Sequence, residues 1–181
     1  MIENKVLEIM EKSTDGFAVM NKIISRYVGE LDSLMKEISD KQLSEISFDL
    51  VGDYYSKLSE RLYFVNASVK KLELENKAAL RTKQEVYNQA VLSIKEDSII
   101  TASKKTQTDI AAEASEIAKE DVIVSDIFDV ALSSVTDRIK DAWNMVSTLK
   151  HRYNAMVQEM QSESYAKNMR AMANQDVRGE N

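Results

Sequence analysis

Apolar residues recur along most of this chain at alternating steps of three and four positions. The average step of 3.5 residues is the period of helices that pack as coiled coils. The first series lies near the N-terminus and comprises Val6, Met10, Ser13, Phe17, Met20, Ile24, Tyr27, Leu31, Leu34 and Ile38. Because the Asp15-Gly16 pair favours a turn, residues 2–39 are predicted to form one helix, or a short helix followed by a longer one from about Thr14.

Two further series each predict a long helix. The second predicts a helix over 49–94, with Ser47 or Asp49 as N-cap, and comprises Tyr55, Leu58, Leu62, Val65, Val69, Leu72, Asn76, Ala79, Lys83, Val86 and Ala90. The third predicts a helix over 122–162 and comprises Phe128, Leu132, Val135, Ile139, Ala142, Val146, Leu149, Tyr153, Met156 and Met160. Residues 95–121 are predicted to form a connector that can hold a short helix over 110–121, and residues 163–181 a flexible tail.

The composition agrees with long helices, because the 181 residues include no proline and only four glycines. We therefore predict an all-α protein with a single domain over 1–181. Its expected architecture is an elongated bundle of three long helices, two of which pair as an antiparallel hairpin through coiled-coil-like seams. A single chain cannot easily cover such long apolar seams, so a homo-oligomer is expected.

Few kinds of catalytic chemistry are compatible with this composition. Cysteine is absent and His151 is the only histidine, so a thiolate metal site, a serine triad and a helical dinuclear iron site all lack their usual residues. We expect no cofactor, no metal site and no enzymatic activity. No apolar run is long enough to span a membrane and the N-terminus does not resemble a secretory signal, so a cytoplasmic location is expected.

The charges are segregated along the chain, although the net charge is only −6. Residues 69–105 carry eight basic and five acidic side chains, and residues 138–178 carry seven and four. Between them, residues 106–137 carry one basic and eight acidic side chains. An acidic protein of this kind can still present a basic surface if its two positive stretches meet in space.

Lys83 is unusual because it falls on the second apolar series. It lies in a basic cluster with Lys70, Lys71, Lys77 and Arg81, and Tyr87 follows one helical turn later. A solvated helix face, with the methylenes of Lys83 lying along the seam, is one interpretation. The other is a site for single-stranded nucleic acid, in which cations contact phosphates and aromatic rings stack on unpaired bases. The second positive stretch favours this interpretation, because it combines basic with aromatic residues: Arg138, Lys140, Lys150 and Arg152 with Trp143 and Tyr153.

A hairpin with its turn near residue 108 would bring the two basic stretches together. In that arrangement Lys77 would lie beside Ile139 and Lys140, and Lys70 beside Val146. The predicted DNA-binding residues are therefore Arg81 and Lys83 as primary contacts, with Lys77, Lys70, Lys71, Lys150 and Arg152 in support and Tyr87 as a stacking residue.

The segment "ENKAALRTKQEVY" (75–87) resembles the motif of UvsY-type phage recombination mediators. The matching positions are Lys77, Ala79, Leu80, Arg81, Lys83, Glu85 and Tyr87. The segment "VSTLKHRYNAM" (146–156) is similar to the last helix of that family, with its aliphatic-Lys-x-Arg pattern at Leu149, Lys150 and Arg152. The N-terminal series has no clear counterpart in the family.

The resemblance implies an all-helical, ring-like homo-oligomer that binds single-stranded DNA in phage recombination and repair. It also implies that the protein helps to load a RecA-like recombinase onto DNA coated by single-strand-binding protein, with Arg81 and Lys83 at the DNA-contacting position. The alternative is a non-enzymatic structural or adaptor protein: a scaffold, an assembly chaperone or an inhibitor of a host protein. This alternative needs only the apolar seams, and the acidic net charge suits it.

Overall fold

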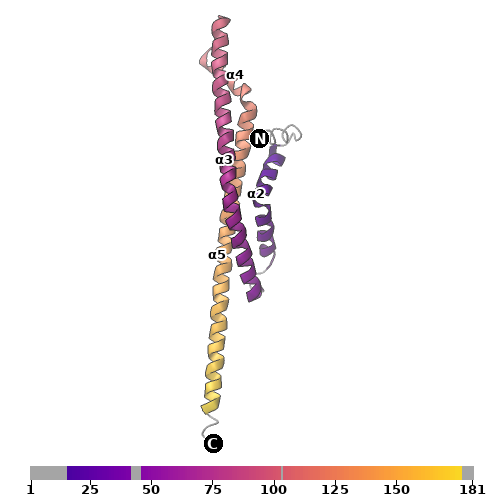
Figure 1. Ribbon diagram of the computed structural model, residues 1–181, viewed down its shortest axis with the longest axis vertical. Coiled ribbons are helices and arrows are strands. Elements are labelled where there is room, and N and C mark those ends of the chain that lie inside the picture. The colour runs from indigo at the N-terminus through magenta and orange to yellow at the C-terminus, as the bar shows by residue number, and fades with distance from the viewer. Residues whose placement is uncertain (1–15, 42–45, 103, 177–181) are drawn as a thin grey trace. The chain divides into compact units, whose positions relative to one another are not determined.

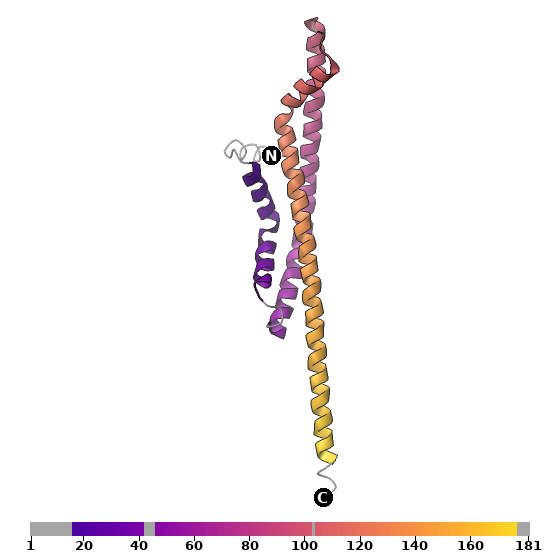
Figure 2. The same cartoon turned by 180° about the vertical axis from the view of Figure 1, so that it is seen from behind.

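The structure describes residues 16–41, 46–102 and 104–176, and their side chains up to residue 170. All regular secondary structure in these residues is helical. This computed structural model contains α2 (Gly16–Ser39), α3 (Phe48–Ile100), α4 (Gln107–Ile117) and α5 (Lys119–Asp176), drawn in Figures 1 and 2. The prediction of an all-α protein is confirmed.

The helix boundaries differ from the predicted ones at several points. The second predicted helix extends to Phe48–Ile100 and the third to Lys119–Asp176, so residues 163–176, predicted as part of a flexible tail, continue α5 as a helix. The connector contains α4 as a separate fourth helix among the described residues. The described part of the first segment begins as a helix at Gly16, close to the alternative start near Thr14, whereas Val6, Met10 and Ser13 lie outside the described residues.

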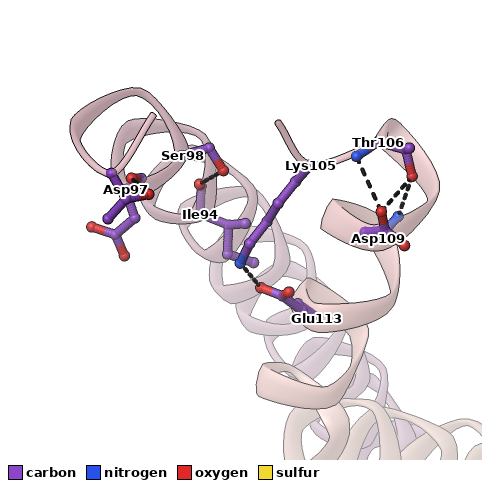
Figure 3. Close-up of polar contacts among 8 residues, drawn as sticks. Ile94, Asp97, Ser98, Lys105, Thr106, Asp109 and Glu113 are labelled. Carbon is purple, nitrogen blue, oxygen red and sulfur yellow. Dashed lines mark hydrogen bonds and ion pairs between the residues drawn. The ribbon is translucent and has the colours of Figure 1, made fainter. Parts of the chain in front are cut away.

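Local hydrogen bonds define the reversal between α3 and α4 (Figure 3). Ala102 adopts a left-handed conformation with φ 55° just after α3. Thr106 then caps α4: its hydroxyl accepts a hydrogen bond from the Asp109 amide, and the Asp109 carboxylate accepts one from the Thr106 amide. The Thr106 hydroxyl, and then the Thr106 amide, donate hydrogen bonds to the Asp109 carboxylate and thereby lower the pKa of Asp109. The Lys105 ammonium lies 2.6 Å from the Glu113 carboxylate, which ties the end of the loop to α4.

The residues pack as two compact units, which are described separately. Among the described residues, unit 1 comprises those within 16–30 and 64–139, and unit 2 those within 31–63 and 140–176. Helices α2, α3 and α5 each contribute to both units, whereas α4 belongs to unit 1.

Unit 1 is built on antiparallel packing of α3 against α4 and the first part of α5, which both views show side by side (Figures 1 and 2). Its core contains predicted members of the second and third series together with residues of α2 and α4; the buried side chains include Ile24, Val28, Leu72, Ala79, Ala90, Ile94, Ile110, Ala114, Phe128 and Val135. The α2 helix is tied to α3 by the Tyr27 hydroxyl, which donates a 3.1 Å hydrogen bond to Glu75 Oε2.

Unit 2 has its own apolar core and an aromatic contact at one end. The buried side chains include Leu31, Ile38, Val51, Tyr54, Leu58, Leu62, Ala142, Val146 and Leu149. The ring of Tyr153 stacks on Phe48, with centroids 4.6 Å apart, and Gly52 leaves room for it, because a Cβ at Gly52 would lie 3.2 Å from the ring. Tyr153 is therefore a packing residue.

Two members of the apolar series are exposed in the single chain. Phe17 in α2 is 64% exposed and Met160 in α5 is 55% exposed. The other described members of the series are buried or half-buried. The periodicity therefore identifies the packed faces of the helices, but not how far the chain itself covers each residue on a face.

Leu72 and Leu74 provide a matched test of the packed face of α3. Leu72 is fully buried and Leu74 is 67% exposed, although only two residues separate them on one helix. We expect Leu72→Ala to lower the free energy of unfolding by about 2–5 kcal/mol, because it leaves a cavity. Leu74→Ala should change it by less than about 0.5 kcal/mol. Chemical denaturation of both variants measures the difference, and equal losses would contradict this orientation of α3.

The contact between Tyr27 and Glu75 predicts a stability loss at alkaline pH. Burial, and then the nearby Glu75 carboxylate, raise the pKa of Tyr27 from 10.0 to about 12. Since the unfolded chain loses this proton first, the contribution is fully present below pH 10 and declines as the pH rises from about 10 towards 12. We expect Tyr27→Phe to remove this part of the decline in melting temperature, measured by thermal unfolding from pH 8 to 12. Parallel curves for the two proteins would contradict the raised pKa.

Candidate nucleic-acid interface

Three basic side chains form a line along the exposed face of α3 in unit 1. Lys70, Lys77 and Arg81 are separated by seven and four residues, which places them on one side of the helix. Each is exposed, and none forms an ion pair within the described residues. We call Lys70, Lys77 and Arg81 the basic stripe.

The basic stripe points away from the apolar contact that builds unit 1. Leu72 and Ala79 on α3 are buried and lie roughly half a turn around the helix from the stripe. Leu74 lies between Lys70 and Lys77 on the stripe side and is 67% exposed. A ligand on this face would therefore meet three cations and one apolar side chain. It would also meet the exposed carboxylates of Glu73 and Glu85, which lie three or four residues from members of the stripe.

Lys83 has a different environment from the basic stripe. Its ammonium lies 3.5 Å from Asp126 Oδ1 of α5, with 33% of the lysine side chain and 67% of the aspartate side chain exposed. The lysine occupies a seam position because its charge reaches a carboxylate on the opposite helix. We therefore assign Lys83 to the hairpin contact instead of to the DNA-contacting position predicted from the sequence.

The segregation of charge along the sequence also has an intramolecular consequence. The basic stretch 69–105 runs antiparallel to the acidic stretch 106–137 in unit 1, and both Lys83–Asp126 and Lys105–Glu113 join them. The Asn76 amide adds a hydrogen bond of 3.4 Å to Asp129. Opposite charges on the two arms of the helical hairpin favour this antiparallel packing over arrangements that bring like charges together.

The predicted register of the hairpin is wrong. Asn76 lies level with Asp129, whereas the prediction placed its neighbour Lys77 beside Ile139 and Lys140. The difference arises because the reversal occurs at 101–106, before α4, and not near residue 108. Lys77 therefore lies level with an acidic part of α5, and the register that was predicted to bring the two basic stretches together is not formed.

Tyr87 belongs to an apolar cluster of unit 1. It packs against the buried side chains of Ala90, Ile94, Ile110 and Ala114. It also lines an open pocket of about 240 Å³ between α3 and α4. Its ring is therefore partly used in packing, and we remove it from the predicted stacking residues. Lys71 is exposed but lies beside the stripe, about 100° around the helix from Lys70.

The second predicted basic stretch lies on α5 within unit 2. Lys150 is exposed, and Trp143, seven residues earlier on the same helix face, is 49% exposed. Arg152 is half-buried, and its Nε has no hydrogen-bond partner among the described residues. Unit 2 therefore presents an aromatic ring and a cation together on one exposed face, which is the combination that the sequence predicted for this stretch.

The described residues offer little for metal or acid–base chemistry. They contain no group of three or more His, Asp or Glu side chains arranged to hold a metal ion. The pocket between α3 and α4, and an open pocket of about 450 Å³ in unit 2 that contains Lys41 and Asp141, each lack histidine and paired carboxylates. None of the helices in the described ranges combines the length and hydrophobicity that a bilayer-spanning segment needs.

Sequence reasoning missed two features of this surface. Leu74 was not included in the site, although its spacing of four from Lys70 and three from Lys77 places it on the same face. The pairing of the acidic stretch 106–137 with the basic stretch 69–105 was not predicted, although its eight carboxylates directly follow a stretch with eight basic residues.

No protein-family model, curated protein or solved structure matches this chain.

The assignment of Lys83 to the hairpin can be tested by a double-mutant cycle with Asp126. We expect a coupling free energy of about 0.5 kcal/mol for Lys83→Ala and Asp126→Ala, because both side chains are partly exposed. The coupling should vanish near 1 M salt, where the screening length is about 3 Å. The matched cycle of Lys77→Ala with Asp126→Ala should give no coupling, and equal values for both lysines would refute the assignment. Denaturant unfolding provides all six free energies.

Proposed function

We propose that this protein binds single-stranded DNA without sequence preference, through the basic stripe of α3. The observation that carries the proposal is the alignment of Lys70, Lys77 and Arg81 on one exposed helix face, without ion-pair partners among the described residues. At a rise of about 1.5 Å per residue, Lys77 and Arg81 are about 6 Å apart along the helix and Lys70 lies about 10 Å further. A phosphate backbone that follows the helix can contact all three.

The exposed Leu74 supports a single strand over a duplex as ligand. In a duplex the base faces are stacked and paired, whereas a single strand can turn its bases towards an apolar side chain. Leu74 lies between Lys70 and Lys77, so bases and phosphates can be contacted together.

Trp143 and Lys150 support a second contact, in unit 2. Trp143 is half-exposed, and base stacking on an exposed ring contributes about 1–3 kcal/mol per base. In the proposal Trp143 replaces Tyr87 as the stacking residue, and Lys150 contacts a neighbouring phosphate.

The acidic net charge is compatible with this function because part of the negative charge is paired with lysines of the same hairpin. Asp126 is within ion-pair distance of Lys83, and Glu113 is within ion-pair distance of Lys105. The basic stripe lies on the side of α3 away from that contact. A locally positive face can therefore exist on a protein whose total charge is negative.

The biological role that we propose follows from the resemblance to UvsY-type mediators. The protein would be non-enzymatic and would help to load a RecA-like recombinase onto DNA that carries single-strand-binding protein. Its architecture would be an elongated bundle of long helices whose coiled-coil seams keep the basic stripe extended. The buried seam residues Leu72, Ala79 and Val135 support this architecture.

Binding to a fluorescent oligothymidine, measured by anisotropy at low salt, tests the proposed site. Replacing Lys70, Lys77 and Arg81 together with alanine should weaken binding by about 10-fold or more, because three phosphate contacts are lost. The slope of log affinity against log salt should become shallower by about 2, at about 0.7 per phosphate on a single strand. A charge-matched control, with Lys36, Lys57 and Lys119 replaced by alanine, should retain the wild-type affinity and slope.

The single tryptophan reports independently on the second contact. Oligothymidine should quench the fluorescence of Trp143 if a base stacks on it. The variant with the altered basic stripe should show the same quenching, but at a higher DNA concentration. Absence of binding at low salt, or equal losses in the stripe variant and its control, would overturn the proposal. In that case the structural or adaptor role would account better for the helical surfaces.

A further inference from the structure

An open pocket of about 240 Å³ lies between α3 and α4 in unit 1, where the two helices run side by side (Figures 1 and 2). Ile110, which is buried, and the half-buried Ala111 form its apolar floor, and the half-buried ring of Tyr87 forms one wall. The exposed side chains of Asn88, Lys95 and Gln107 line its mouth. The pocket therefore combines an apolar interior with a polar rim, and no residue of the basic stripe belongs to it.

The rim of this pocket offers a cation and two amides to a ligand. Among the described residues that line it, Lys95 is the only charged one. Neither Lys95 nor Gln107 forms an ion pair or a hydrogen bond with another described residue. The Asn88 Oδ1 accepts a 3.3 Å hydrogen bond from Gln84 Nε2, which leaves the amide N–H groups of Asn88 able to donate. The pocket is therefore suited to a ligand that is anionic and also has hydrogen-bonding groups.

The pocket lies on the continuation of the basic stripe. Asn88 follows Arg81 by seven residues and Lys95 follows Asn88 by seven, so all three lie on one face of α3. At a rise of about 1.5 Å per residue, Asn88 lies about 10 Å beyond Arg81 along the helix, and Lys95 about 10 Å further. A strand that continues along this face beyond Arg81 passes the mouth of the pocket.

A nucleotide matches the pocket better than a protein side chain does. A base has apolar faces, which fit the floor at Ile110, and hydrogen-bonding groups on its edge, which the amides of Asn88 and Gln107 can pair. Its phosphate would neutralise Lys95. An aliphatic side chain would use only the apolar floor, and a carboxylate side chain would pair with Lys95 but leave the floor unused.

We propose that this pocket holds one base of the single-stranded DNA that follows the basic stripe, while Lys95 contacts the phosphate of the same nucleotide. The inference rests on the proposed function, because the stripe brings the strand to the pocket. Tyr87 is here a wall fixed by its packing and not a freely exposed stacking ring. An amide carries both a donor and an acceptor, so Asn88 and Gln107 can serve different bases. The pocket thus requires a base without selecting one, in agreement with binding that has no sequence preference.

Strands with and without bases test the pocket. The affinities of the full-length protein for oligothymidine and for an abasic strand of equal length are compared by anisotropy, since the abasic strand keeps the phosphates. Ala111→Leu fills the pocket and should reduce the preference for oligothymidine by about 5-fold or more, as expected for the loss of one base contact. Ala112→Leu, at an exposed position one residue further, is the matched control and should keep the wild-type preference.

Lys95→Ala separates the phosphate contact from the base contact. It should weaken binding of both strands by a similar factor and make the slope of log affinity against log salt shallower by about 0.7. Lys119→Ala removes the same charge from the start of α5, where Lys119 pairs with Glu116, and should leave both affinities unchanged. Equal effects of the two lysine variants would exclude a phosphate at Lys95.

Photo-cross-linking locates the base without depending on the stability of any variant. A strand that contains iododeoxyuridine should cross-link to Tyr87 of the wild-type protein, which mass spectrometry of the peptides identifies. Cross-links that all lie outside the pocket, or equal preferences in Ala111→Leu and Ala112→Leu, would overturn the inference. Either result can occur while the stripe variant still loses affinity, which leaves the proposed function intact. Absence of oligothymidine binding by the wild-type protein at low salt would instead overturn both.

Discussion

The antiparallel packing of α3 against α4 and the first part of α5 is the constraint on which unit 1 depends. Burial of one face of α3 requires that each residue on that face be small, be apolar or reach a partner of opposite charge. Leu72 and Ala79 satisfy the first conditions, and Lys83 satisfies the last through Asp126. The lysine within the apolar series is therefore explained by the fold before any ligand is considered. What remains for a ligand is the opposite side of α3, where the charges have no such role.

Charge segregation along the sequence consequently serves two purposes. The acidic stretch 106–137 neutralises part of the positive charge of the basic stretch 69–105 and favours the observed packing of the two segments. Interactions between partly exposed charges are weak individually, so they select among pairings that the apolar residues would otherwise permit. Because the basic stripe lies on the far side of α3, it is separated from these carboxylates by the width of the helix, about 10 Å including side chains. This separation is comparable to the screening length at physiological salt.

The pattern of apolar residues was sufficient to predict the helical class and the packed faces. Leu72 and Leu74 were distinguished correctly by spacing alone. The register was not predictable in this way, since a shift by one heptad leaves a series with a period of 3.5 residues almost unchanged. Register instead depends on where the chain reverses and on individual pairs such as Asn76–Asp129, which periodicity does not specify. Phe17 and Met160 fit their series as well as the buried residues do, so spacing could not reveal that they are more than half exposed. The site could be predicted only in part. Tyr87 and Lys83 were chosen by residue type alone, whereas the residues that surround them belong to α4 and α5, whose positions the spacing does not give.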